Sequence, residues 1–418
     1  MLFLLLFELS ILMGFLLDLL FADPEKLPHP VVIIGKGISF LEKHLRQIFP
    51  QTQGGLRAAG VVMAVLIPVT TFAASAGLCI LAWIIHPVLF FLLHTLWCWQ
   101  AVAIRGLAEE AKNVYRCLEE RPAENMREAE PTESGDDRSA PGESQTAAGG
   151  KDSGDSNRDP VWLVAARKAV SRIVGRDTQA LDAAGVTRAA VETVAENYSD
   201  GVIAPYFYMM IGGAPLALTY KSINTMDSMV GYKNETYIDF GRVPAHLDDV
   251  VGYIPARLGA LLWICAAGLT KPVSTKDFVK AVDSPCGIAS GTAAKTDNSN
   301  GPDIDCGSNG PDIVCGSNGP NIVYGARGAW RIWRRDSRNH ASPNSAQTES
   351  ACAGALGVQL AGPAYYFGEF YDKPTIGDAL RPIEPKDILR TNKMMYAASL
   401  LTVLLAMGVS TALLVAFV

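Results

Sequence analysis

The chain has 418 residues, of which 49% are hydrophobic and only 19% are charged, and its formal net charge is −6. A chain of this length has room for two or three soluble domains, but its apolar residues are concentrated in long runs separated by polar loops. This pattern excludes an ordinary soluble protein and predicts an all-α, polytopic integral membrane protein, because a bilayer span needs roughly 20 mostly apolar residues.

The first predicted membrane helix comprises residues 1–21. The segment is apolar and resembles a secretory signal peptide in length. It lacks a basic region at its start and a small-residue cleavage site at its end, and it carries Glu8 and Asp18. These features disfavour a signal peptide, so we expect a membrane helix that is retained.

Five further apolar segments follow. Residues 58–85, 86–104 and 396–418 are strong candidates for membrane spans. Residues 202–220 and 251–269 are weaker candidates, because proline and glycine interrupt both and the second also contains an arginine. Irregular backbone at membrane depth is tolerated only where it is packed in protein or lines a cavity. We therefore expect these two segments to be partly re-entrant or broken helices that help to form a site.

The orientation of the chain follows from its positive charges. Five Lys and Arg residues between positions 22 and 57 place this first loop in the cytoplasm by the positive-inside rule. If every apolar segment crosses the bilayer, residues 221–249 lie outside the cell. We expect that one of the two weak segments does not cross the bilayer, so that residues 221–249 lie in the cytoplasm. The sequence thus predicts a multi-pass protein of the plasma membrane with a cytoplasmic active site.

Two polar inserts divide the chain into regions 1–122, 160–283 and 338–418. The inserts, 123–159 and 284–337, have few large apolar residues and are predicted to be disordered. The second contains three nine-residue copies, SNGPDIDCG, SNGPDIVCG and SNGPNIVYG. A calcium-binding β-roll is a weaker interpretation of this repeat, because the paired glycines and spaced aspartates of such a roll are missing.

A basic segment with two tryptophans ends the second insert. Residues 327–338 carry Trp330 and Trp333 among several arginines. Such a segment is typical of a membrane-surface helix or of a loop anchor. Nucleic-acid binding is disfavoured, because the surrounding chain is acidic.

Polar clusters in or beside the apolar segments are the candidates for function, because a charge there is costly. The first contains His29 in DPEKLPHPVVIIGK. His29 is a candidate acid, base or phosphate contact, and a Pro-rich turn that leaves the first membrane helix explains the segment equally well.

The second cluster is ETVAENYSDGVIAP, with Glu192, Glu196, Asn197, Ser199 and Asp200. The two glutamates are four residues apart, so their carboxylates share one face of a helix. Ser199 or Asp200 is suited to cap the next helix, but capping explains one residue of the group and not five. Paired carboxylates at a membrane boundary suit Mg²⁺ held for a nucleotide phosphate.

The third cluster is KSINTMDSMVGY. Lys221, Asn224 and Asp227 lie three residues apart in succession, and therefore on one helical face. A cation beside an amide and a carboxylate is a plausible grip for phosphate and metal. A solvated helix end is the structural alternative.

Two further groups complete the set. Asp248 and Asp249 precede Arg257 in HLDDVVGYIPAR. The arginine lies in an apolar run and needs a ligand anion or one of these two aspartates as a partner. Ser342 and Asn344 lie in a turn, where their side chains can bind backbone or ligand, before a helix of small residues that permits close packing.

These clusters, in this order, resemble the CobD/CbiB family of cobalamin biosynthesis proteins, the adenosylcobinamide-phosphate synthases. The motifs that carry the resemblance are DPEKLPHPVVIIGK, ETVAENYSDGVIAP, NTMDSMVGY, LDDVVGYIPAR and SPNSAQTESACAGALG, and the match covers nearly the whole chain outside the two inserts. The chain departs from the usual motifs at Tyr198 and at residues 345–348.

The resemblance implies an ATP-dependent amide ligation. It joins adenosylcobyric acid to (R)-1-aminopropan-2-yl phosphate or to a related amino-alcohol phosphate. ATP and Mg²⁺ are the implied cofactors, and the corrinoid is a substrate. The lipid bilayer and, by docking, other enzymes of the corrin pathway are the expected partners. The expected catalytic residues are Glu192, Glu196, Asp200 and Asp227, and the expected metal ligands are Glu196, Asp200 and Asp227. The expected substrate-binding residues are His29, Asn197, Ser199, Lys221, Asn224, Asp248, Asp249, Arg257, Ser342 and Asn344.

Three other functions are compatible with parts of the sequence. A transporter also uses broken helices with charges at membrane depth, but it predicts inverted repeats, which we do not find in the sequence. A transferase acting on CDP-alcohols needs a DG-x2-AR motif, whereas Asp200-Gly201 is followed by Val-Ile-Ala-Pro. A non-catalytic scaffold that docks corrin enzymes is the third alternative, and it leaves the carboxylates dispensable.

Overall fold

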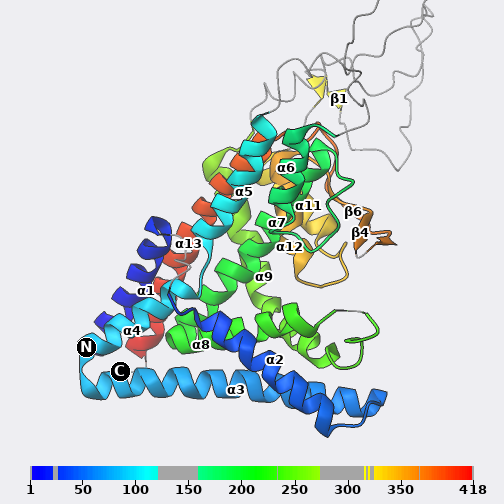
Figure 1. The fold of residues 1–418 in the computed structure, drawn as a ribbon. Helices are drawn as coiled ribbons and strands as arrows, with labels where there is room; N and C mark the ends of the chain where they lie inside the picture. The colour runs from blue at the N-terminus through cyan, green and yellow to red at the C-terminus, as the bar shows by residue number, and fades with distance from the viewer. Residues whose placement is uncertain are drawn as a thin grey trace, which may run out of the picture.

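Helices dominate the structure (Figure 1). The computed structural model describes residues 2–21, 27–120, 159–232, 234–273, 315–316, 319–320, 324–366 and 368–416. The helices of the first third are α1 (Leu2–Leu20), α2 (Pro30–Ile48), α3 (Gln53–Ile85), α4 (Pro87–Gln100) and α5 (Ile104–Glu119). Helix α3 lies along one edge of the molecule (Figure 1). The start of α1 lies against the end of α3, where Phe3 contacts Trp83.

The rest of the chain adds the helices that carry the polar motifs. They are α6 (Val161–Val170), α7 (Ala183–Tyr198), a π-helical turn (Ser199–Ile203), α8 (Ala204–Val230), α9 (Arg242–Thr270), α11 (Gly325–Asp336), α12 (Ser345–Leu356) and α13 (Lys386–Ala416). Six short strands pair as antiparallel ribbons: β1 (Cys315–Gly316) with β2 (Gly319–Pro320), β3 (Leu360–Ala361) with β6 (Thr375–Ile376), and β4 (Ala364–Tyr366) with β5 (Glu369–Tyr371). The ribbons β3–β6 and β4–β5 follow α12 and were not expected from the sequence.

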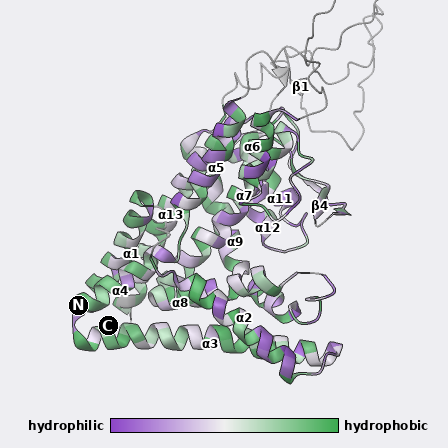
Figure 2. Cartoon of the chain, viewed as in Figure 1, coloured by the Kyte–Doolittle hydropathy of each residue, from purple (hydrophilic) through white to green (hydrophobic). Residues whose placement is uncertain are grey.

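Among the described residues, six helical stretches are long and apolar enough to cross a membrane, and each overlaps one of the six predicted segments. Hydrophobic residues cover α1, α4 and most of α3, whereas α5, α6 and α11 at the opposite end are more hydrophilic (Figure 2). The prediction of an all-α, multi-pass membrane protein is therefore confirmed. Of the two predicted disordered inserts, the structure describes Asp159, β1, β2 and residues 324–337. The prediction of disorder is wrong for the last of these, because they contain α11. The other residues of both inserts lie outside the described part of the chain.

Helix α8 is broken where glycine and proline interrupt the apolar run, as predicted. Gly212 and Gly213 have non-helical backbone angles, and Gly213 has φ +67° and ψ −161°. The break leaves the N–H of Ala214 without its helical acceptor, and this N–H donates to His94 Nε2 of α4 at 3.0 Å. His94 Nδ1 lies 2.6 Å from the hydroxyl of Ser10, which itself donates to a backbone carbonyl of α1. The neutral tautomer with hydrogen on Nδ1 satisfies the whole chain of bonds.

Helix α9 is not interrupted, so the expected break at Pro255 is wrong. Proline removes one helical hydrogen bond and leaves the carbonyl of the residue four positions earlier without a donor. That carbonyl belongs to Val251, and it accepts the hydroxyl of Tyr208 of α8 at 3.0 Å. A neighbouring helix thus replaces the missing backbone donor, which is how membrane helices tolerate proline.

The basic segment with two tryptophans forms α11, which packs against α9 and α12. Trp333 turns inwards and donates through Nε1 to Gln347 Oε1 at 2.9 Å, whereas Trp330 is 45% exposed. Arg331 and Arg335 both pair with Asp378 in the loop after β6. The segment therefore anchors the chain that follows α12 to the helical core.

Candidate functional site

Ten of the residues predicted from the sequence line one cavity of about 480 Å³, which we call the carboxylate chamber. Their side chains come from α7, the π-helical turn, α8, α9 and the loop that precedes α12. They are Glu196, Asn197, Ser199, Asp200, Asn224, Asp227, Asp248, Asp249, Ser342 and Asn344. Motifs that are far apart in the sequence therefore meet at a single place.

The π-helical turn determines which side chains of its motif reach this chamber. Such a turn inserts a residue into a helix and often marks a functional site. Ser199 and Asp200 open the turn and face the chamber, together with Glu196 one turn earlier. Val202 and Ile203 of the same turn are buried in the hydrophobic core. The polar and apolar halves of the motif are thus separated.

A network of polar bonds holds the loop before α12 against α9. Ser342 Oγ donates to Asp249 Oδ1 at 2.9 Å, and Asn344 Nδ2 donates to the backbone carbonyl of Asp249 at 2.9 Å. Arg257 donates to Asn344 Oδ1 and to the carbonyl of Pro343, both at 3.3 Å. A side chain at Gly252 would come within 2.8 Å of Asn344, so glycine is needed for this close approach.

A smaller cavity of about 260 Å³ adjoins the first, which we call the mixed-charge chamber. Its charged and phenolic lining residues are Arg176, Glu192, Glu196, Glu349, Tyr366 and Lys373. Glu196 and Asn197 line both chambers, as does His340. The two cavities therefore form one cleft with a shared wall.

Two buried glutamates define the mixed-charge chamber. Glu192 forms an ion pair with Arg176 and accepts the backbone N–H of Ala361 at 2.6 Å. Glu349 is only 4% exposed. Burial raises the pKa of the Glu349 carboxyl well above its ordinary range, and the negative charges of Glu196 and Glu192 raise it further, against the opposing effect of the nearby Arg176.

Three predicted residues do not line either chamber. His29 caps α2 by accepting the N–H of Val31 at 3.2 Å, which supports the structural interpretation of its motif. Lys221 donates to Asn224 Oδ1 at 3.3 Å and thus contacts a chamber residue without lining the chamber itself. Arg257 stacks on Tyr253 and supports the loop before α12, rather than pairing with Asp248 or Asp249.

The donor set of the carboxylate chamber fits Mg²⁺ that arrives with a phosphate ligand. Across the described residues, no three His, Cys, Asp or Glu side chains are arranged to hold a metal ion by themselves. Mg²⁺ is usually bound through one or two carboxylates, several waters and the phosphate oxygens of a substrate. Apart from His340, the polar side chains of the chamber are carboxylates, amides and hydroxyls, which are oxygen ligands of this kind. The assignment of Glu196, Asp200 and Asp227 as ligands stays a prediction.

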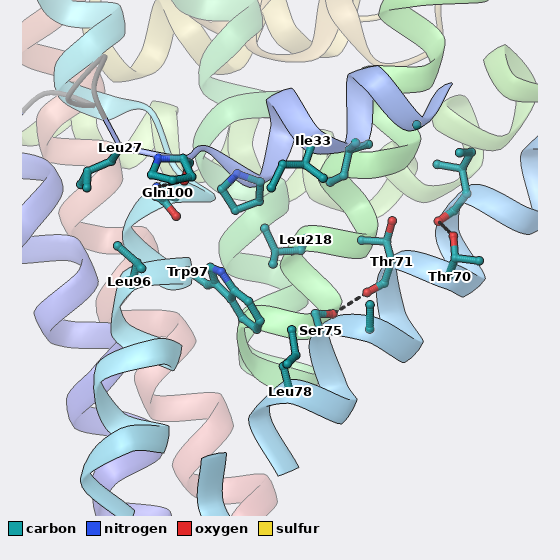
Figure 3. A pocket seen from close by; sticks show the side chains of 16 residues that line it. Leu27, Ile33, Thr70, Thr71, Ser75, Leu78, Leu96, Trp97, Gln100 and Leu218 are labelled. Atoms are coloured by element: carbon teal, nitrogen blue, oxygen red, sulfur yellow. Dashed lines mark hydrogen bonds between the residues drawn. The ribbon is translucent and has the colours of Figure 1, made fainter. Parts of the chain in front are cut away.

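A third cavity is not a centre of chemistry. It has a volume of about 570 Å³ and lies between α2, α3, α4 and α8 (Figure 3). None of the residues that line it is titratable. Its hydroxyl groups bind their own helix, as Thr70 does with the carbonyl of Leu66 at 2.6 Å and Ser75 with that of Thr71 at 2.7 Å. The reactive groups are in the cleft instead.

Sequence reasoning missed five charged or titratable lining residues, namely Arg176, His340, Glu349, Tyr366 and Lys373. Glu349 had a usable signal, because it is a lone acid in a helix of small residues. Arg176 and Lys373 lie in polar loops, where nothing distinguishes them from solvated charges. The unusual Tyr198 is fully buried and binds Thr402 of α13 at 2.9 Å, so this departure from the motif concerns packing and not the cleft.

Comparisons with known proteins give one consistent match. A sequence profile described as "CobD/Cbib protein" matches residues 11–148 and 153–395. Two proteins named "Cobalamin biosynthesis protein CobD" are similar: that of Geobacter metallireducens is 40% identical over 403 residues and that of Clostridium perfringens 35% identical over 399, each alignment covering 96% of both chains. The "Cobalamin biosynthesis protein CbiB" of Salmonella choleraesuis is 36% identical over 392 residues, or 94% of both chains. No solved structure matches.

Proposed function

The chain belongs to the CobD/CbiB family of cobalamin biosynthesis proteins, and from this premise we propose that its cleft is the active site of an adenosylcobinamide-phosphate synthase. The reaction joins the amine of (R)-1-aminopropan-2-yl phosphate, or a related amino-alcohol phosphate, to a propionate of adenosylcobyric acid. A carbon–nitrogen bond forms, one carboxylate oxygen leaves with the phosphate released from ATP, and the ammonium group gives up two of its three protons.

The observation that carries this proposal is the convergence of carboxylates and amides from four separate motifs on one cavity. Asp200, Asp227, Asp248 and Asp249 are next to one another there, although charges of like sign repel. Such a group is costly to assemble in a membrane protein and is useful when cations or phosphate–metal complexes bind between them. A purely structural role explains one or two capping carboxylates, but not four around a cavity.

The sizes of the cavities indicate how a corrinoid is bound. A cavity of about 480 Å³ is of the size that encloses a drug-sized ligand, and a corrin macrocycle with its adenosyl group is larger. We infer that the ring stays outside and that only its propionate arm enters the cleft. The cleft then positions three small groups: this carboxylate, the amine and the phosphates of ATP.

The carboxylate chamber is the proposed site for ATP and Mg²⁺. Glu196, Asp200 and Asp227 are the proposed ligands, and when bound the ion neutralises charge on the phosphate being transferred. Asn197, Ser199 and Asn224 line the same chamber, and their proposed role is to donate hydrogen bonds to substrate oxygens. Holding the reacting groups together in a water-poor cleft is the main contribution of the chain itself. Because ATP is cytoplasmic, we place the cleft on the cytoplasmic side of the plasma membrane.

The proposal is tested with the purified full-length protein in lipid nanodiscs, supplied with adenosylcobyric acid, amino-alcohol phosphate, ATP and Mg²⁺. We expect amidated corrinoid from the wild type, no product with EDTA, and recovery when Mg²⁺ is restored. Asp227→Asn and Asp248→Asn should each lower the rate at least a hundredfold, because they remove a charge from the chamber. Asp239→Asn is the matched control, since Asp239 pairs with Arg57 away from the cleft.

Two results contradict the proposal. Unchanged turnover in both chamber variants, with the protein still folded, means that these carboxylates have no catalytic role. Wild-type protein that binds the corrinoid but never amidates it is a scaffold or a transporter, the two alternatives that the sequence left open.

A further inference from the structure

The two chambers of the cleft differ in the sign of their charges. The carboxylate chamber has no Lys or Arg among its lining residues. The mixed-charge chamber is lined by Arg176 and Lys373 as well as by glutamates. A phosphate group therefore needs a metal ion in the first chamber, whereas the second offers side-chain cations directly.

The two cations are held in place by neighbouring groups. Lys373 Nζ donates to the hydroxyl of Tyr366 at 2.6 Å and lies over its ring, 4.2 Å from the centroid. Arg176 is paired with Glu192, and the two side chains are only 13% and 11% exposed. An ammonium group has three donors and a guanidinium has five, so each cation can bind a phosphate oxygen while it keeps its present partner.

A buried carboxyl group faces the same space. Glu349 is 4% exposed and lines the mixed-charge chamber. In the part of the chain that the structure describes, no hydrogen bond to its carboxyl oxygens is found. The oxygens of this carboxyl group are therefore open to a ligand that brings a hydrogen-bond donor or a positive charge.

We propose that the mixed-charge chamber is the binding site of the amino-alcohol phosphate, an inference that rests on the proposed function. Lys373 and Arg176 bind the phosphate of this ligand, and Glu349 binds its ammonium group. The ligand carries both charges on a three-carbon frame, and the chamber of about 260 Å³ holds a molecule of that size but excludes the corrinoid. Glu196 and Asn197 belong to both chambers. An amine placed beside this shared wall is next to the carboxylate chamber, where the propionate is activated.

The test measures binding of (R)-1-aminopropan-2-yl phosphate to the full-length protein in nanodiscs by calorimetry, without ATP or corrinoid. Isopropyl phosphate, which lacks the amine, is the second probe. Lys373→Gln should weaken both ligands about tenfold or more, because each loses a charge-assisted hydrogen bond. Lys373→Arg should restore most of the affinity. Glu349→Gln should weaken the amino-alcohol phosphate about tenfold and leave isopropyl phosphate within twofold. Asp239→Asn is again the control, with both affinities unchanged.

Three outcomes overturn the assignment. Equal loss of both ligands in Glu349→Gln means that the glutamate has a structural role. A loss in Asp227→Asn as large as that in Lys373→Gln places the ligand in the carboxylate chamber. If Lys373→Gln and Glu349→Gln both amidate the corrinoid at the wild-type rate and with an unchanged KM for the amino-alcohol phosphate, the binding site is refuted while the proposed function stands. Absence of amidation by the wild type refutes the proposed function instead, and the two failures are thereby separated.

Discussion

The break in α8 provides a quantitative test of the fold, through the substitution Gly213→Ala. The backbone at Gly213, with φ +67° and ψ −161°, lies in a region that is almost restricted to glycine. Forcing another residue there costs about 1–3 kcal/mol. The added Cβ would also lie 2.4 Å from His94 Nε2 and 2.7 Å from Phe7 Cε2, so the imidazole must move. Its bond with the N–H of Ala214 is then lost, at a further cost of about 1–3 kcal/mol for an unsatisfied buried donor.

The two contributions predict that Gly213→Ala lowers the free energy of unfolding by about 2–6 kcal/mol. The assay is SDS titration of the protein in mixed micelles, followed by circular dichroism. Gly77→Ala is the matched control, because a Cβ at Gly77 of α3 meets no atom within 4 Å. The control should be neutral or stabilising by up to about 1 kcal/mol, since alanine is favoured over glycine in a helix.

A double-mutant cycle with His94→Ala separates the clash from the backbone strain. With the ring removed, Gly213→Ala should cost less than it does in the wild type, and the difference is the coupling energy. The reasoning is refuted if Gly213→Ala changes the stability by less than 1 kcal/mol, or if its cost is the same in the presence and in the absence of the ring. Amidation should also fall in Gly213→Ala, because the half of α8 beyond the break carries Asn224 and Asp227.

Two further substitutions test the electrostatics outside the membrane helices. The pKa of Glu349 is raised by burial and by Glu196 and Glu192, so its ionised form opposes folding. The contribution of Glu349 to stability should therefore be most favourable at about pH 4 and should fall as the pH rises towards the folded pKa. Glu349→Gln should therefore have a higher Tm than the wild type at pH 7–8 and nearly the same Tm at pH 4. If the curves of Tm against pH are parallel for the two proteins, ionisation of Glu349 does not oppose folding. Arg381, in the loop between β6 and α13, and Asp387, at the start of α13, form a salt bridge in which both side chains are 0% exposed. Arg381→Met should cost about 3 kcal/mol, the lower end of the range for breaking a buried ion pair, because the Asp387 carboxylate keeps its ion pair with Arg390 at 2.8 Å. Arg381→Met combined with Asp387→Asn should recover part of this loss, and equal stability of the single and double variants argues against this explanation.

The membrane helices were predictable because their signal is local. Each of the six spans is a long apolar run, and the bilayer selects for length and composition rather than for a detailed packing pattern. The effect of individual prolines was not predictable in the same way. Gly212 and Gly213 break α8, whereas Pro255 leaves α9 continuous, because the carbonyl that Pro255 frees is satisfied by Tyr208 from another helix.

Much of the cleft was also recognisable from the sequence. Carboxylates such as Asp200, Asp227 and Asp248 attract notice, because a charge beside an apolar segment needs a reason. Their roles stay predictions. Arg257 was in the right motif, but its contacts with Asn344 and the loop before α12 give it a supporting position. Arg257 binds the Asn344 amide and the Pro343 carbonyl, and not a nearby aspartate, because of where the loop before α12 lies.

The sequence by itself determined the class of protein, the six apolar helices and the polar motifs that meet in the carboxylate chamber. Each of these depends on composition and spacing within a short stretch of chain. Only the tertiary structure decided that Arg176, Glu349 and Lys373 surround a second chamber, since they come from three separate segments and nothing in the local sequence of one relates it to the others. Their proximity arises from the packing of α12 and its following strands against α7, and long-range contacts of this kind leave no local signal in the order of residues.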